Sequence, residues 1–117
     1  MNDMINHPTH YTQAGVMLEP IDVLRYAPFD LGNALKYILR AGHKDNALQD
    51  LEKAEVYIEW ALDSYKRNPE PYQTFLNKYG SLLVKFDVFN HLGDCYDFWE
   101  FAKILVVLIE KKKGDFV

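Results

Sequence analysis

The chain has 117 residues, of which 49% are hydrophobic and 15% aromatic, which suits one domain with a buried core and excludes a disordered chain. Its formal net charge is -4, with 13 basic and 17 acidic residues, so it lacks the positive surplus that binding of long nucleic acid needs. No apolar run approaches the roughly 20 residues of a membrane span, and the first residues do not resemble a secretory signal. The sequence predicts one cytoplasmic domain over residues 1–117, with no membrane partner.

Several familiar kinds of site are missing from the sequence. It has neither a P-loop motif nor the glycine-rich fingerprint of a dinucleotide fold. The single cysteine, Cys95, can form no intramolecular disulfide and is expected to pack as a small apolar residue. His7 and His10 are three residues apart and could approach one metal ion, but no third ligand is fixed by spacing. We therefore predict no metal site.

Near the N-terminus, the stretch NHPTHYTQAGVMLEP (residues 6–20) has no sustained hydrophobic period and is expected to form an ordered arm. Pro20 suits the first turn of a short helix that ends at the Ala27–Pro28 step. Asp30 is expected to cap the next helix, which carries a row of apolar residues and closes at Gly42.

A longer helix is predicted after a short linker, because Asn46 and Gln49 resemble a capping box and apolar residues then recur at helical spacing up to Leu62. The linker HKDN is short enough to predict an antiparallel helical hairpin. The stretch RNPEP breaks the pattern and divides a hairpin region, residues 6–67, from an aromatic-rich helical extension, residues 68–117.

Three helical segments are expected in that extension. One ends at Gly80, the ambiguous stretch SLLVKFDVFNHL is assigned as helix rather than as a lone strand, and a last helix ends in three lysines that suit its own dipole. The predicted fold class is all-α: a compact domain of about five helices, built on the hairpin and preceded by the ordered arm.

The stretch LGNALKYILRAGHK places Lys36, Arg40 and Lys44 at successive four-residue steps, hence in one column on a helix. Three like charges in a column repel one another, and the stretch has no carboxylate at helical spacing to relieve them. Either acidic side chains from elsewhere, such as Asp50 and Glu52 of the following helix, pair with the column, or an anion does.

Neighbouring residues favour a nucleotide as that anion. Tyr37 offers an aromatic plane and Asn33 an amide, while His7, His10 and Tyr11 of the arm add donors beside an aromatic surface. Each has a structural alternative: Tyr37 as a core residue, His10 as a local cap, and Lys44 as a residue that merely follows the helix end.

The order of these residues is more informative than their types. NHPTHYT, EPIDVL, LGNALKYILRAGHK and DLEKAEVYIEWAL, together spanning about residues 6–62, closely resemble a family of small phage and prophage proteins of unknown function. One branch of that family consists of nucleotide kinases from T7-type phages. These kinases lack a P-loop.

The resemblance implies a deoxynucleoside monophosphate kinase that converts substrates such as dTMP or dGMP to diphosphates with a nucleoside triphosphate as donor, in the cytoplasm of an infected or lysogenic bacterium. Lys36, Arg40 and Lys44 would then stabilise the phosphates in catalysis, and His7, His10, Tyr11, Asn33 and Tyr37 would bind substrate. Fixed cations could replace part of the electrostatic role of magnesium, which would then not be required.

Two other functions stay open from the sequence. The first is a non-catalytic protein that binds or sequesters nucleotides, and the second is a helical protein-interaction module that uses the aromatic extension. Because one column reaches only one side of two bound nucleotides, we also expect a homo-oligomer with sites near its interfaces.

Overall fold

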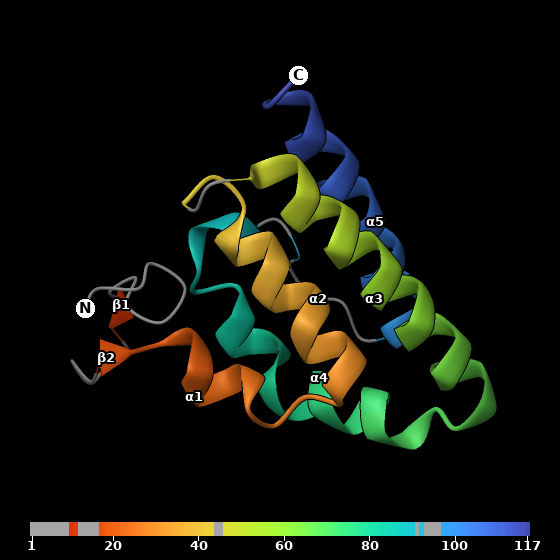
Figure 1. Ribbon diagram of the computed structural model, residues 1–117. Helices are drawn as coiled ribbons and strands as arrows, with labels where there is room; N and C mark the ends of the chain where they lie inside the picture. The colour runs from red at the N-terminus through yellow and green to blue at the C-terminus, as the bar shows by residue number, and fades with distance from the viewer. Residues whose placement is uncertain (1–9, 12–16, 44–45, 91, 93–96) are drawn as a thin grey trace.

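The structure, a computed structural model, describes residues 10–11, 17–43, 46–90, 92 and 97–117. The helices in this part of the chain are α1 (Pro20–Leu24), α2 (Phe29–Arg40), α3 (Ala47–Arg67), α4 (Glu70–Leu83), the 3₁₀ helix η1 (Asp87–Phe89) and α5 (Phe98–Gly114) (Figure 1). The predicted all-α domain with about five helices is confirmed. None of the described helices is long and apolar enough to cross a membrane.

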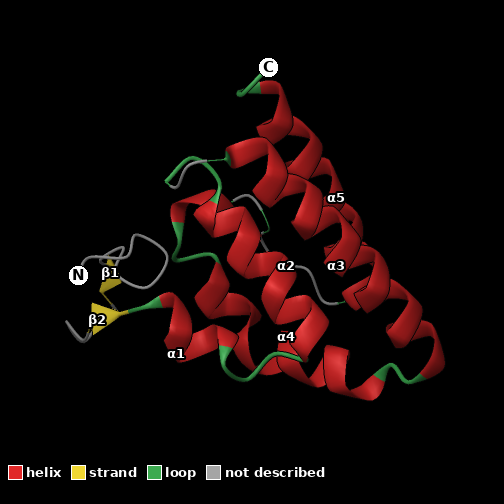
Figure 2. Ribbon diagram, in the orientation of Figure 1, coloured by secondary structure: helices red, strands yellow, loops and turns green. Residues whose placement is uncertain are grey.

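Two short strands precede the helices: β1 (His10–Tyr11) and β2 (Met17–Leu18) pair antiparallel beside α1, with His10 opposite Leu18 (Figure 2). The remainder of the predicted ordered arm, residues 1–9 and 12–16, lies outside the described residues. The same holds for Cys95, so its predicted packing stays a prediction.

The predicted antiparallel hairpin is formed by α2 and α3, which pack along each other (Figure 1). Asn46 caps α3 as expected, because its side-chain oxygen accepts the N–H of Gln49 at 2.9 Å. At the other side of the linker, Gly42 follows the end of α2 with a φ of 94°, a left-handed conformation that side-chain-bearing residues rarely adopt. Both ends of the hairpin turn are therefore set by local sequence.

The prediction that Asp30 caps α2 is wrong, because α2 begins at Phe29 and Asp30 lies within its first turn. The carboxylate of Asp30 accepts hydrogen bonds from the Tyr72 hydroxyl at 2.8 and 3.0 Å and from the Ser64 hydroxyl at 3.2 Å. Asp30 thus connects α2 to α3 and α4. Burial raises the pKa of Tyr72, and the bond to Asp30 raises it further.

The predicted end of a helix at Gly80 is also wrong, since α4 continues to Leu83. A Cβ at Gly80 would lie 3.1 Å from Leu76 Cδ1, so the glycine leaves room for the buried Leu76. The stretch assigned as helix after Gly80 is helical only in part: it completes α4, turns, and forms η1. Phe86 and Phe89, which both follow that turn, are buried, so the chain bends to place both rings in the core.

One hydrophobic core joins the predicted hairpin region to the predicted extension. Helix α5 lies alongside α3 (Figure 1) and contributes Phe98, Phe101 and Leu105. The ring of Phe98 lies 5.0 Å from that of Tyr65 and 5.1 Å from that of Tyr72. The division of the chain at residues 67 and 68 stays a prediction about ancestry and function, because both parts share this core.

Candidate functional site

A surface pocket of about 380 Å³ lies between α1 and α2. The two helices are joined by a short turn, and Gly32 leaves space against it: a Cβ there would be 3.5 Å from both Ala27 Cβ and the Leu24 carbonyl oxygen. The lining is mainly apolar and includes three polar side chains, Arg25, Asn33 and Lys36. An apolar pocket with a few polar groups is the usual form of a small-molecule site.

Two of the predicted ligands, Asn33 and Lys36, are thus brought together in one pocket. Asn33 is fixed there because its Nδ2 donates to the carbonyl oxygen of Phe29 at 2.9 Å, one turn earlier in α2. The side-chain oxygen of Asn33 can accept a hydrogen bond from a ligand. Arg25 and Phe29 also line the pocket, and neither was predicted, because nothing in their sequence spacing relates them to the cation column.

Tyr37 brings two cations to one aromatic ring. Lys36 Nζ lies 4.4 Å and Lys53 Nζ lies 5.3 Å from the centre of the Tyr37 ring. The ring is also stacked against Tyr57 of α3, with centroids 6.0 Å apart and planes 11° apart. Tyr37 is half-buried, and its ring is contacted by one lysine from each helix of the hairpin. Lys53, which was not among the predicted site residues, joins Lys36 there.

Arg40 lies one turn further along α2 and pairs with Asp50 of α3, with 3.4 Å between Arg40 Nε and Asp50 Oδ2. The Asp50 side chain is 6% exposed, whereas that of Arg40 is 38% exposed. Neither atom of the pair has a hydrogen bond within the described structure, so the attraction is one of charge. The sequence left open whether acidic side chains or an anion pair with the cation column. At Arg40 an acidic side chain, Asp50, does so, while the exposed part of Arg40 remains accessible to an anion.

The other predicted site residues are described less fully. His7 and Lys44 lie outside the described residues. His10 and Tyr11 are described in their backbone alone, as strand β1. Their roles as ligands therefore stay predictions.

An aromatic ridge continues from the pocket across the outer side of the hairpin. Phe29 packs edge-on against Tyr57 at 6.1 Å, and Tyr57 packs edge-on against Trp60 at 5.3 Å. Phe29 is 76% exposed and Trp60 56% exposed, which is unusual for rings of this size. The only sequence signal for the ridge was that Trp60 is out of phase with the apolar residues of α3.

Two lysines of α5 contact the α2–α3 hairpin near the C-terminal end of α2. Lys112 Nζ donates to the carbonyl oxygens of Ile38 at 3.2 Å and Ala41 at 3.5 Å, and burial lowers the pKa of Lys112. Lys113 Nζ lies 2.8 Å from Glu55 Oε1 of α3, and their hydrogen bond lowers the pKa of Glu55 and raises that of Lys113. The terminal lysines were expected to serve their own helix, and two of them also hold the hairpin to α5.

A second pocket of about 470 Å³ lies on the other side of the α1–α2 turn, lined in part by the stacked rings of Tyr26 and Tyr79. Its charged lining residues are Glu70 and Lys78, which balance each other. It contains none of the predicted ligands. The α1–α2 pocket and the adjoining face of α2 are therefore the better candidate for an anionic ligand.

Comparison with known proteins relates the first half of the chain to a family. Residues 5–59, just under half of the chain, match a family described as a protein of unknown function (DUF3310). This agrees with the resemblance over residues 6–62 as far as similarity to a family of unknown function. No curated protein and no solved structure matches the chain.

Proposed function

We propose that the α1–α2 pocket and the adjoining face of α2 bind a nucleoside phosphate. The observation that carries this proposal is that Lys36 and Lys53 both lie over the ring of Tyr37. Lys36 also lines the mainly apolar pocket, together with Arg25 and Asn33. A nucleotide combines a flat, weakly polar base with concentrated negative charge. The site offers the complementary pair of surfaces.

The pocket volume suits one base with its sugar, because small-molecule sites occupy about 300–1,000 Å³. In this arrangement the base enters among the apolar residues and Asn33 bonds its edge. The phosphate then lies toward Lys36, with Arg25 on one side and the exposed part of Arg40 one helical turn away. Asp50 Oδ2 lies 3.4 Å from Arg40 Nε, and the 38% of the Arg40 side chain that is exposed is the part available to a phosphate.

The activity that we propose for this site is that of a deoxynucleoside monophosphate kinase, as in the T7-type phage branch of the family that the sequence resembles. A phosphate oxygen of the monophosphate attacks the γ-phosphorus of a nucleoside triphosphate, the bond from that phosphorus to the bridging oxygen breaks, and two diphosphates leave. Such a transfer needs in-line positioning and charge stabilisation more than covalent help. Lys36, Arg40 and Lys44 would supply the charge, and magnesium would not be required.

The proposed setting follows from the same resemblance. It is the cytoplasm of a bacterial host during infection or lysogeny, with the protein as a homo-oligomer. A pocket of this size holds one nucleotide, so a kinase must hold the second one outside it. The exposed face of α2 toward Arg40, completed by a neighbouring subunit, is the place we propose for the triphosphate.

The test is a product assay with ATP and each deoxynucleoside monophosphate, with magnesium and with EDTA, resolved by chromatography. We expect a deoxynucleoside diphosphate that persists in EDTA. Lys36→Met should remove both turnover and monophosphate binding. Lys103→Met is the matched control, because Lys103 Nζ also lies over an aromatic ring, that of Trp99 at 5.4 Å, but on α5. Loss of activity in both variants or in neither would contradict the assignment.

A second candidate is nucleotide binding without catalysis. The ion pair of Arg40 with Asp50 favours it, since a catalytic arginine that is partly neutralised stabilises transferred charge less well. The same assay separates the two functions. Thermal stabilisation by nucleotides without formation of any diphosphate product would support binding alone, and a ligand at 100 times its dissociation constant stabilises by about 2.7 kcal/mol.

A further inference from the structure

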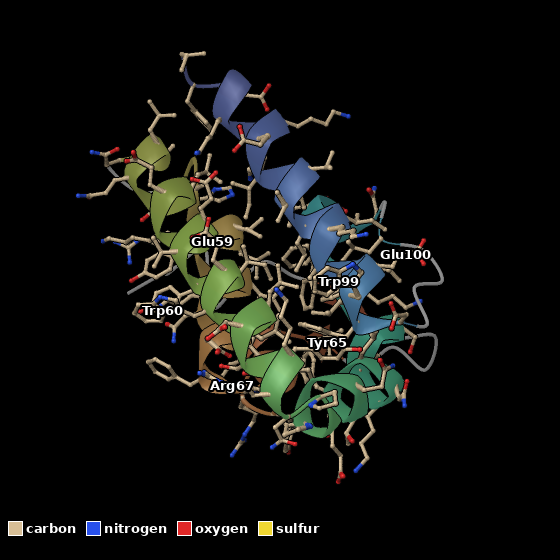
Figure 3. The ribbon with its side chains drawn as sticks, turned by 90° about the vertical axis from the view of Figure 1, so that its right-hand side faces the viewer. Glu59, Trp60, Tyr65, Arg67, Trp99 and Glu100 are labelled. Atoms are coloured by element: carbon tan, nitrogen blue, oxygen red, sulfur yellow. The ribbon has the colours of Figure 1, made fainter. Side chains whose placement is uncertain are left out.

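A stripe of five residues runs along the outer side of α3: Lys53, Val56, Trp60, Asp63 and Arg67. Successive members are alternately three and four residues apart, so they share one side of the helix, opposite the buried residues Leu51, Ala54, Ile58 and Ala61. In Figure 3, Trp60 and Arg67 project from the side of α3 that faces away from α5.

The centre of this stripe is apolar and exposed. Val56 is 45% and Trp60 56% exposed, whereas the side chains of Asp63 and Arg67, toward one end, are 66% and 72% exposed. The five positions have the alternating spacing of three and four that a coiled-coil seam uses, with the two apolar residues, Val56 and Trp60, flanked by charges. Val56 and Trp60 thus form an exposed apolar centre within an otherwise charged stripe.

The charges on the stripe distinguish the two ways in which it could pair with itself. In a parallel pair each residue faces its own copy, which sets Lys53 against lysine, Asp63 against aspartate and Arg67 against arginine. In an antiparallel pair centred between Val56 and Trp60, each Val56 faces a Trp60, and each Lys53 faces an Asp63. Only the antiparallel register pairs opposite charges on both sides of an apolar centre.

We propose that this stripe is a self-association surface, on which α3 of a second copy packs antiparallel about a two-fold axis between Val56 and Trp60. The occupant is a second copy because, in this register, Val56 faces Trp60 and Lys53 faces Asp63 on both sides of the axis. The proposal does not depend on the nucleotide. It places the Phe29–Tyr57–Trp60 ridge beside the dimer interface, and Phe29 also lines the α1–α2 pocket.

The contacts already made by these residues are compatible with the pairing. Lys53 Nζ lies 5.3 Å from the Tyr37 ring centre, and Asp63 Oδ2 lies 3.1 Å from a terminal nitrogen of Arg67 in the same helix. Both are weak surface interactions, which do not prevent the same groups from contacting a partner subunit. A carboxylate accepts from more than one donor, so Asp63 can keep Arg67 and still receive Lys53 of the partner subunit.

The test is the oligomeric state of the full chain, measured by sedimentation velocity over a concentration series. We expect a dimer that Val56→Glu and Trp60→Glu convert to monomer. The matched control is Val107→Glu, because Val107 is 61% exposed on α5, outside the stripe. Circular dichroism checks that each variant remains helical. A monomeric wild type, or a dimer that tolerates both stripe substitutions, would overturn the proposal.

Charge reversal tests the register itself. Lys53→Asp and Asp63→Lys should each weaken self-association by about tenfold or more, since two symmetry-related pairs become repulsive. Mixed in equal amounts, the two single variants should form a heterodimer, because the stripe of one variant is then acidic at both positions and the stripe of the other is basic at both. Failure of the mixture to associate, while the wild type does, would overturn the antiparallel arrangement.

Discussion

Arg40 Nε and Asp50 Oδ2 lie 3.4 Å apart across the α2–α3 hairpin, and Asp50 is the one charged residue that is buried in the described part of the chain. The pair joins the middle of the cation column to the first turn of the facing helix. We therefore expect Arg40 to stabilise the fold, whatever anion its exposed part binds.

Arg40→Met should lower the free energy of unfolding by about 1–3 kcal/mol, less than for a fully buried pair because Arg40 is partly exposed. Most of this loss is the cost of an unpaired buried carboxylate. The double variant Arg40→Met with Asp50→Asn should recover part of it, as measured by urea unfolding in a double-mutant cycle. Strictly additive effects would mean that the two side chains do not interact in solution.

Tyr72→Phe should destabilise the protein by about 1–2 kcal/mol, because it removes the hydroxyl that donates to Asp30 between α4 and α2. The substitution should also change how stability depends on pH in the alkaline range. The pKa of Tyr72 is raised above its ordinary value of 10.0, so its contribution is complete below pH 10.0 and is lost as pH rises through the folded-state pKa.

The measurement is the melting temperature of wild type and Tyr72→Phe across the alkaline range. Tyr79→Phe is the control, since Tyr79 contacts Tyr26 and Phe75 through its ring. The two variants should differ in slope above pH 10.0. Parallel curves would show that the hydroxyl of Tyr72 is equally easy to ionise in the folded and unfolded chains.

The Glu55–Lys113 pair should make stability depend on acid pH. The pKa of Glu55 is lowered from its ordinary value of 4.5 by the hydrogen bond to Lys113, so the stabilisation is present above pH 4.5 and is lost as pH falls through the folded-state pKa. Lys113→Met should remove about 0.5–1 kcal/mol at neutral pH and little once Glu55 is protonated. Lys111→Met, an exposed neighbour, is the control that should leave the acid limb unchanged.

Gly32→Ala should separate stability from ligand binding at the α1–α2 pocket. The new methyl group makes ordinary contacts, 3.5 Å from Ala27 Cβ and the Leu24 carbonyl oxygen, so the helix should gain up to about 1 kcal/mol. The methyl group also occupies space among the residues that line the pocket, and nucleotide affinity should fall. Calorimetric titration with deoxynucleoside monophosphates measures this change.

Gly114→Ala is the control for Gly32→Ala, because a Cβ at Gly114, the last residue of α5, meets nothing within 4 Å. It should leave affinity unchanged. A Gly32→Ala protein that is more stable and binds nucleotide as tightly as the wild type would place the ligand elsewhere.

Local sequence determined the hairpin and its turn. The Asn46 cap, the left-handed Gly42 and the apolar repeats of α2 and α3 act over a few residues, and a short linker forces two helices to fold back on each other. The meeting of Arg40 with Asp50 follows from the same local geometry. For the same reason, Asn33 and Lys36 were identifiable as one site from their spacing on one helix.

Tertiary structure alone decided the features that join distant segments. Asp30 was expected as a cap, but Tyr72, 42 residues later, takes its carboxylate as an acceptor. Lys112 was expected to serve α5, but it binds carbonyl groups at the end of α2. Lys53 joins Lys36 only because α3 brings it over Tyr37. Periodicity and capping report the energetics of one helix, whereas each of these contacts depends on where a second helix packs, which the whole core determines.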